Sequence, residues 1–126
     1  MLMICIEPES EVPIYTQLTN QIIQGIVRRE ILPGDSLPSV RSFAADLGVN
    51  MHTVNKSYHE LEKKGVIRIV PKSGAVIATH DKFDEAIYQR IMEDIKPQIA
   101  EALVFGIDEE KIQMMVKTII EDFKNK

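Results

Sequence analysis

Residues 39–65 read SVRSFAADLGVNMHTVNKSYHELEKKG and predict two short helices separated by a tight turn. The first helix begins after Ser39, a good N-cap, and Gly48 suits the left-handed residue that ends a helix. Asn50 caps the second helix, and Gly65 ends it. Two helices joined by a short turn that contains glycine are the signature of a helix-turn-helix.

The predicted helices span about residues 39–47 and 51–64. In the second, Val54, Tyr58 and Leu61 recur at helical spacing, so we expect them in the core. The opposite face is polar and basic near the helix N-terminus, as a helix that reads base edges in the major groove requires. This polar face by itself does not indicate DNA binding, because an ordinary solvent-exposed helix face has the same composition. The side chains on this face are His52, Asn55, Lys56, His59 and Lys63.

The sequence also predicts a β-hairpin after these two helices, and a helix and a short strand before them. Two β-rich runs, 66–70 and 75–79, follow the second helix, and the loop PKSG at 71–74 between them predicts a hairpin. A hairpin in this position is the wing of a winged helix-turn-helix. Upstream, apolar residues at i+4 spacing predict an amphipathic helix over about 13–29, and a short strand is expected at 3–6.

Composition limits the class of protein. The chain has 126 residues, of which 44% are apolar and 27% charged, so it is neither disordered nor dominated by membrane spans. A single cysteine cannot form an internal disulfide, which fits a cytoplasmic protein. No signal-peptide pattern precedes the predicted domain.

The net charge of −4 is unevenly distributed. Residues 1–79 carry 8 basic and 8 acidic side chains, whereas residues 80–126 carry 7 basic and 11 acidic ones. Within residues 38–72 there are 6 basic and 3 acidic side chains, a local charge of +3. The total therefore hides a modestly basic segment that could meet nucleic acid.

The start of the first short helix is a candidate phosphate site. A helix N-terminus offers free N–H groups, and the Ser39 hydroxyl and the Arg41 guanidinium would strengthen binding. Lys72, at the tip of the hairpin, could follow the DNA backbone or enter a minor groove. An N-cap, a surface arginine and a solubilising lysine are the plain structural alternatives.

The last third of the chain predicts two more helices. One begins near Lys82, and Pro97 should kink or split it. Asp108 caps the other. An apolar stripe this large should be covered, and a second copy of the chain is the expected cover, although packing within the chain is an alternative. The stripe at i+4 spacing consists of Phe83, Ile87, Ile91 and Ile95, and Tyr88, Met92, Ile99 and Leu103 widen it.

The residues point to no catalytic chemistry. No two of the three histidines and one cysteine have zinc-finger or HExxH spacing, and no phosphate-binding or nucleophile-elbow motif occurs. We therefore expect no enzyme, no metal and no cofactor. No pattern points to a particular small-molecule effector.

Four ordered motifs closely resemble the DNA-binding domain of GntR-family transcriptional regulators. They are PIYTQL at 13–18, LPGDSLPSVR at 32–41, LGVNMHTV at 47–54 and YHELEKKGVI at 58–67. The resemblance covers about residues 10–79. The short C-terminal part resembles the YtrA-type subfamily, whose tail is a pair of helices used for dimerisation.

The resemblance implies roles for individual residues. Family positions matched by Ser39 and Arg41 grip the DNA backbone, and those at the start of the second helix contact phosphates and bases. Many relatives carry arginine where this chain has Met51 or Asn55. The candidate DNA-contacting residues are Ser39, Arg41, Asn50, His52, Thr53, Asn55, Lys56, Lys72, Ser73 and Gly74.

Together these observations predict a mainly α protein with a small β-hairpin. Residues 1–79 would form a winged helix-turn-helix DNA-binding domain, and residues 80–126 a helical dimerisation segment. The expected function is repression of transcription by a cytoplasmic homodimer on a two-fold operator. Helix 51–64 would enter the major groove, with the 70–75 wing at its flank. The alternative is an adaptor whose winged helix binds another protein.

Overall fold

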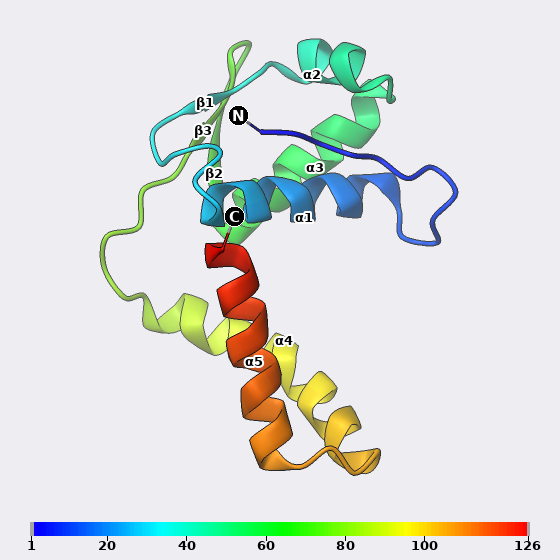
Figure 1. Ribbon diagram of the computed structural model, residues 1–126. Coiled ribbons are helices and arrows are strands. Elements are labelled where there is room, and N and C mark those ends of the chain that lie inside the picture. The colour runs from blue at the N-terminus through cyan, green and yellow to red at the C-terminus, as the bar shows by residue number, and fades with distance from the viewer. Residues whose placement is uncertain (1, 126) are drawn as a thin grey trace. The chain divides into compact units, whose positions relative to one another are not determined.

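The computed structural model describes residues 2–125, and the chain divides into one compact unit up to Thr79 and another from His80 (Figure 1). The described residues are mainly helical with a small antiparallel sheet, which confirms the predicted fold class. The elements are α1 (Ile14–Val27), β1 (Ser36–Leu37), α2 (Val40–Leu47), α3 (Met51–Lys64), β2 (Ile67–Val70), β3 (Gly74–Ile77), α4 (Glu85–Val104) and α5 (Glu109–Lys124).

The helix-turn-helix has the caps that the sequence predicts. The Ser39 hydroxyl accepts a hydrogen bond from the Ser42 N–H at 3.1 Å. The Asn50 side chain accepts one from the His52 N–H at 2.7 Å. Gly48 ends α2 in the left-handed region at a φ of 70°, where a side chain would be strained. Local chemistry alone therefore fixes where α2 ends and α3 begins.

The sheet has three antiparallel strands in the order β1-β3-β2. The predicted hairpin of β2 and β3 is confirmed, with Ile67 opposite Ile77 and Val70 opposite Gly74. Strand β1 is not among the predicted elements. It has only two residues, Ser36 and Leu37, which form a strand because they pair with β3. Two residues are too few to show an alternating apolar pattern, so the sequence does not predict this strand.

The core of the first unit lies between α1, α2, α3 and the sheet, which pack against one another. One polar pair crosses it, since the hydroxyls of Thr19 on α1 and Ser57 on α3 lie 2.8 Å apart. Their hydrogen bond satisfies two buried polar groups at the same time. The buried apolar residues are Leu18, Ile22, Ile31, Leu37, Phe43, Ala44, Val54, Tyr58, Leu61, Ile67, Ala75 and Ile77.

The strand predicted at residues 3–6 is wrong. The segment runs extended but outside the sheet (Figure 1), and two glutamine side chains of α1 bind it in place of a neighbouring strand. Gln21 hydrogen-bonds both the N–H and the carbonyl of Cys5, at 2.8 and 2.7 Å. Gln17 does the same for Glu7, at 2.8 and 3.0 Å. Side-chain amides thus satisfy the backbone groups that a sheet would otherwise satisfy.

In the second unit, α4 runs unbroken through Pro97. Of the two predicted outcomes, a kink or a split, the split is therefore wrong. Proline removes one backbone donor, and on this exposed helix water can satisfy the freed carbonyl. The helix begins at Glu85, capped by Asp84, so Phe83 precedes it. Neither α4 nor α5 has a buried residue. Between residues 2 and 125, no helix is both long and apolar enough to cross a bilayer.

Candidate nucleic-acid interface

The start of α2, the exposed face of α3 and the wing together line a groove of about 560 Å³. The groove brings together five of the ten residues predicted to contact DNA, although they are distant in sequence. The wing contributes most of the remaining lining. The lining residues are Ser39, Val40, Arg41, Asn55, Tyr58, Ile69, Val70, Pro71, Lys72 and Gly74.

Two cationic side chains lie at this groove without an acidic partner among residues 2–125. They are Arg41, in the first turn of α2, and Lys72, at the wing tip, and both are exposed. The N-terminus of α2 adds the positive end of a helix dipole beside Arg41. This combination of a guanidinium, an ammonium and helix N–H groups suits the phosphates of a nucleic acid backbone.

The α3 side of the groove carries hydrogen-bonding groups. Asn55 is exposed and lines the groove, whereas Asn50 lies at the N-cap, where its side-chain oxygen is already used. His52 is exposed one turn before Asn55, and Thr53 is half-buried. The His59 ring hydrogen-bonds the Asn55 carbonyl at 2.8 Å. The first turns of α3 therefore offer the chemistry that base edges require.

Lys56 does not line the groove. Its ammonium lies 4.1 Å from the ring centroid of Tyr15 on α1, a cation–π contact. A helical wheel of α3 groups Lys56 with Asn55 because they are neighbours, but α1 packs beside α3 and holds the lysine on that side. Ser73, exposed at the wing tip, also lies outside the groove lining.

The wing is tightly built at its base. Lys72 has a φ of 68° and Gly74 a φ of 100°, so two left-handed residues reverse the chain. A Cβ on Gly74 would lie 2.5 Å from the Leu37 carbonyl oxygen and 2.7 Å from that of Pro38. Only glycine allows the wing to approach the segment before α2 this closely.

Tyr58 is a groove residue that sequence reasoning assigned only to the core. It is 1% exposed, and its hydroxyl donates a hydrogen bond to the Pro38 carbonyl at 2.7 Å. Burial raises the pKa of this phenol well above its usual range, so the group stays a donor. The available signal was position. Tyr58 follows Asn55 by three residues, so their side chains are only about 60° apart around α3, and Tyr58 lies where the core face borders the polar face.

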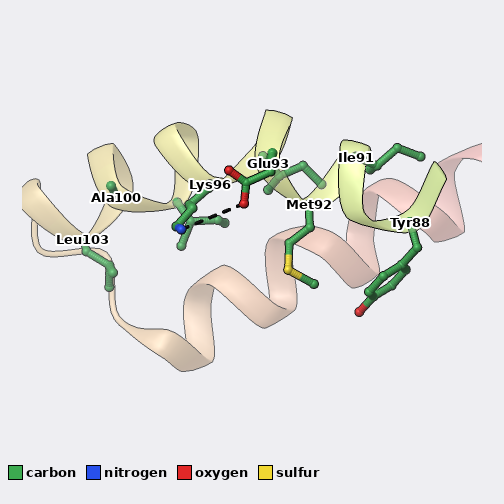
Figure 2. Close-up of a pocket in the computed structure, with 9 residues that line it drawn as sticks. Tyr88, Ile91, Met92, Glu93, Lys96, Ala100 and Leu103 are labelled. Atoms are coloured by element: carbon green, nitrogen blue, oxygen red, sulfur yellow. Dashed lines mark ion pairs between the residues drawn. The ribbon is translucent and has the colours of Figure 1, made fainter. Parts of the chain in front are cut away.

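The second unit carries a separate apolar groove of about 560 Å³ along α4 (Figure 2). Figure 2 shows Tyr88, Met92 and Leu103 extending from one side of the helix, with Ile91 pointing away from them. A Lys96–Glu93 ion pair of 3.9 Å lies among them. Two of the four residues predicted for the dimer interface, Phe83 and Ile87, do not line this groove. Its lining is Tyr88, Ile91, Met92, Glu93, Ile95, Lys96, Ile99, Ala100 and Leu103.

Comparisons with known proteins agree with this architecture. Residues 14–77 match the family described as bacterial regulatory proteins, gntR family. The chain is 36% identical over 124 residues to the HTH-type transcriptional repressor YtrA of Bacillus subtilis strain 168, and the match covers 97% of this chain and 95% of that protein.

Two crystal structures extend the comparison. A transcriptional antiterminator from Listeria monocytogenes EGD-e has a TM-score of 0.85 and 30% identity, covering 98% of this chain and 94% of its own. The AraR(DBD) in complex with operator ORX1 has a TM-score of 0.52 and 29% identity, covering 59% of this chain and 92% of its own.

The three helices and the wing define a winged helix-turn-helix protein of the class that regulates transcription. The chain belongs to the gntR family of bacterial regulatory proteins.

Proposed function

We propose that this protein represses transcription by binding as a homodimer to a two-fold symmetric operator. The observation that carries the proposal is the groove, in which the start of α2, the polar face of α3 and the wing tip converge. Its uncompensated cations suit phosphates, and its amide suits base edges. The similarity to the repressor YtrA supports repression as the outcome of binding.

Phosphate contacts would fix the position of each protomer on the duplex. Ser39 and Arg41 would hold one phosphate at the start of α2, where helix N–H groups add to their hydrogen bonds. Lys72 and Ser73 would meet the backbone or the minor groove at the flank, and Gly74 allows the wing to reach it. Contacts of this kind set register without reading sequence.

Base contacts would come from α3 in the major groove. Asn55 can pair with both N6 and N7 of adenine, and His52 lies on the same exposed side one turn earlier. Thr53 and Asn50, at the helix start, would contact phosphates or bases at the groove edge. Lys56 would reach a phosphate on the side toward α1, where Tyr15 holds its ammonium.

The second unit would join two protomers. Its two helices leave large apolar side chains exposed, including Ile91 at 45% and Ile95 at 46% on α4. Burying such a surface against a second copy removes it from water twice in a symmetric interface. The full-length similarity to YtrA includes this unit. Since the ligand would be chromosomal DNA, we place the protein in the cytoplasm.

Selection of bound duplexes from a random DNA library tests the proposal. The expected result is an inverted repeat whose half-sites lie about 10 base pairs apart, or a multiple of that spacing. Sedimentation with the selected duplex should give two protomers per site. A single protomer bound at full affinity to a sequence without two-fold symmetry would refute the homodimer. Failure to enrich any sequence would refute operator binding.

A further inference from the structure

Three elements of the first unit meet at one backbone carbonyl, that of Pro38. The Tyr58 hydroxyl on α3 donates to this oxygen at 2.7 Å. Gly74, the first residue of β3, lies against the same carbonyl, because a Cβ there would lie 2.7 Å from it. Pro38 immediately precedes Ser39, the N-cap of α2. The carbonyl therefore links the three walls of the DNA-binding groove.

The Tyr58 ring cannot move to follow this carbonyl. Its side chain is 1% exposed, and its ring packs against that of Phe43 on α2, with centroids 6.3 Å apart. Core packing thus fixes the hydroxyl relative to α3, and the hydrogen bond transfers that position to the Pro38 peptide. A phenylalanine would fill the same core volume, so only the contact with Pro38 requires the oxygen atom.

The base of the wing also packs against the Pro38 carbonyl, through Gly74. At the first residue of β3 the chain passes close over the Leu37 and Pro38 carbonyls, with no side chain between. A shift of the Pro38 peptide would therefore move both the start of α2 and the base of the wing. Arg41 follows the peptide by three residues, and Lys72 precedes Gly74 by two.

We propose that Tyr58 is a positioning residue for DNA binding, whose hydroxyl holds the Pro38 carbonyl and so sets the start of α2 and the wing at the spacing that DNA requires. This inference rests on the proposed function of the groove. Tyr58 itself would touch no DNA, and its effect would pass through Arg41 and Lys72.

The test compares Tyr58→Phe with Ser57→Ala. Ser57 precedes Tyr58 and is fully buried. The Ser57→Ala variant loses the hydrogen bond of 2.8 Å to Thr19, which lies on the side of α3 toward α1. Both variants should lower the melting temperature by similar amounts, since each loses one buried hydrogen bond. Only Tyr58→Phe should weaken binding to a duplex selected by the wild type, by about five- to tenfold, and flatten the salt dependence of binding.

A double-mutant cycle separates positioning from general stability. Arg41→Ala should cost less affinity in the Tyr58→Phe background than in the wild type, because Arg41 is already displaced there. In the Ser57→Ala background, Arg41→Ala should cost the same as in the wild type. Amide chemical shifts of Ser39 to Arg41 and of the wing should change in free Tyr58→Phe and stay unchanged in Ser57→Ala.

The outcomes distinguish this inference from the proposed function. If Arg41→Ala binds the selected duplex as tightly as the wild type, the assignment of the groove to DNA fails. If Arg41→Ala weakens binding while Tyr58→Phe and Ser57→Ala lose affinity equally and the cycle is additive, the groove stands and the positioning role of Tyr58 is overturned.

Discussion

Arg41 and Asn55 lie in the same groove but on different helices. Under the proposed function, Arg41 would contact a phosphate and Asn55 would contact bases. Arg41 lies in the first turn of α2, where helix N–H groups favour an anion, whereas Asn55 lies in the second turn of α3. The sequence could predict both, since helical periodicity and capping place them. It could not place Lys56, whose direction depends on the Tyr15 ring of a helix far away in the chain.

Arg41→Ala and Asn55→Ala should therefore weaken binding differently. Arg41→Ala should weaken binding to all duplexes and reduce the salt slope by about one unit, because one phosphate contact is lost. Asn55→Ala should cost about 1–3 kcal/mol on the selected duplex and relax base choice at one or two positions. Gel shifts on selected and random duplexes at several salt concentrations measure both. An equal loss by Asn55→Ala on both duplexes would contradict base reading.

Tyr58 should also give the stability a dependence on alkaline pH. The folded state raises the pKa of this phenol above its ordinary value of 10.0, so it binds the proton more tightly than the unfolded chain does. The associated stability is complete below about pH 10 and falls as the pH rises further. Urea unfolding at neutral pH and at about pH 11 should show a smaller loss for Tyr58→Phe than for the wild type. Equal losses would show that Tyr58 is not the group responsible.

A helix or strand boundary can be predicted from the sequence when neighbouring residues determine it, and not when distant residues do. Helix ends are predictable because glycine, serine and asparagine have strong conformational preferences at caps. Strand β1 and the extended segment at residues 3–6 are set by partners elsewhere, a strand in one case and glutamine side chains in the other. The continuity of α4 through Pro97 likewise reflects its solvent-exposed surroundings.

Gly74→Ala should distort the wing. The residue has a φ of 100°, and the new Cβ would collide with the backbone carbonyls of Leu37 and Pro38. Gly34→Ala is a matched control, because its φ is 88° and nothing lies within 4 Å of the added carbon. The control should lose about 1 kcal/mol of unfolding free energy and Gly74→Ala clearly more. Urea unfolding measures both, and equal losses would mean that the base of the wing adjusts freely.

Charge is unevenly distributed over the whole chain. Residues 80–126 carry the net charge of −4, whereas the winged helix is neutral overall and basic where it would meet DNA. An acidic second unit would be repelled by the duplex, which favours contact through the first unit alone. The sequence predicts an apolar stripe on α4, and Ile91, Met92, Ile95 and Ile99 of that stripe line the groove. Phe83 and Ile87 lie outside the lining, and Phe83 precedes the helix.

Ile95→Glu should produce monomers that keep a folded winged helix. The residue lines the apolar groove of α4, and a buried carboxylate without a partner costs several kcal/mol, twice over in a symmetric interface. Affinity for the selected duplex should fall steeply, because the second protomer is no longer tethered. Sedimentation and circular dichroism measure association and folding.

Glu101→Gln is the control for charge on α4, since it changes the charge by one unit on an exposed residue outside the groove lining. It should remain dimeric. If Ile95→Glu is also dimeric, the interface lies elsewhere, for example on α5. If Ile95→Glu unfolds throughout, the α4 stripe belongs to the core of its own chain.

The buried core ends at Ile77, two residues before the boundary between the two compact units. Every buried apolar side chain of the described residues therefore belongs to the segment that also builds the groove. A gene rearrangement that joins a different coding sequence after Thr79 would leave this buried core complete. In evolutionary terms, the first unit has the properties of a transferable cassette, because its core would survive exchange of the segment that follows it.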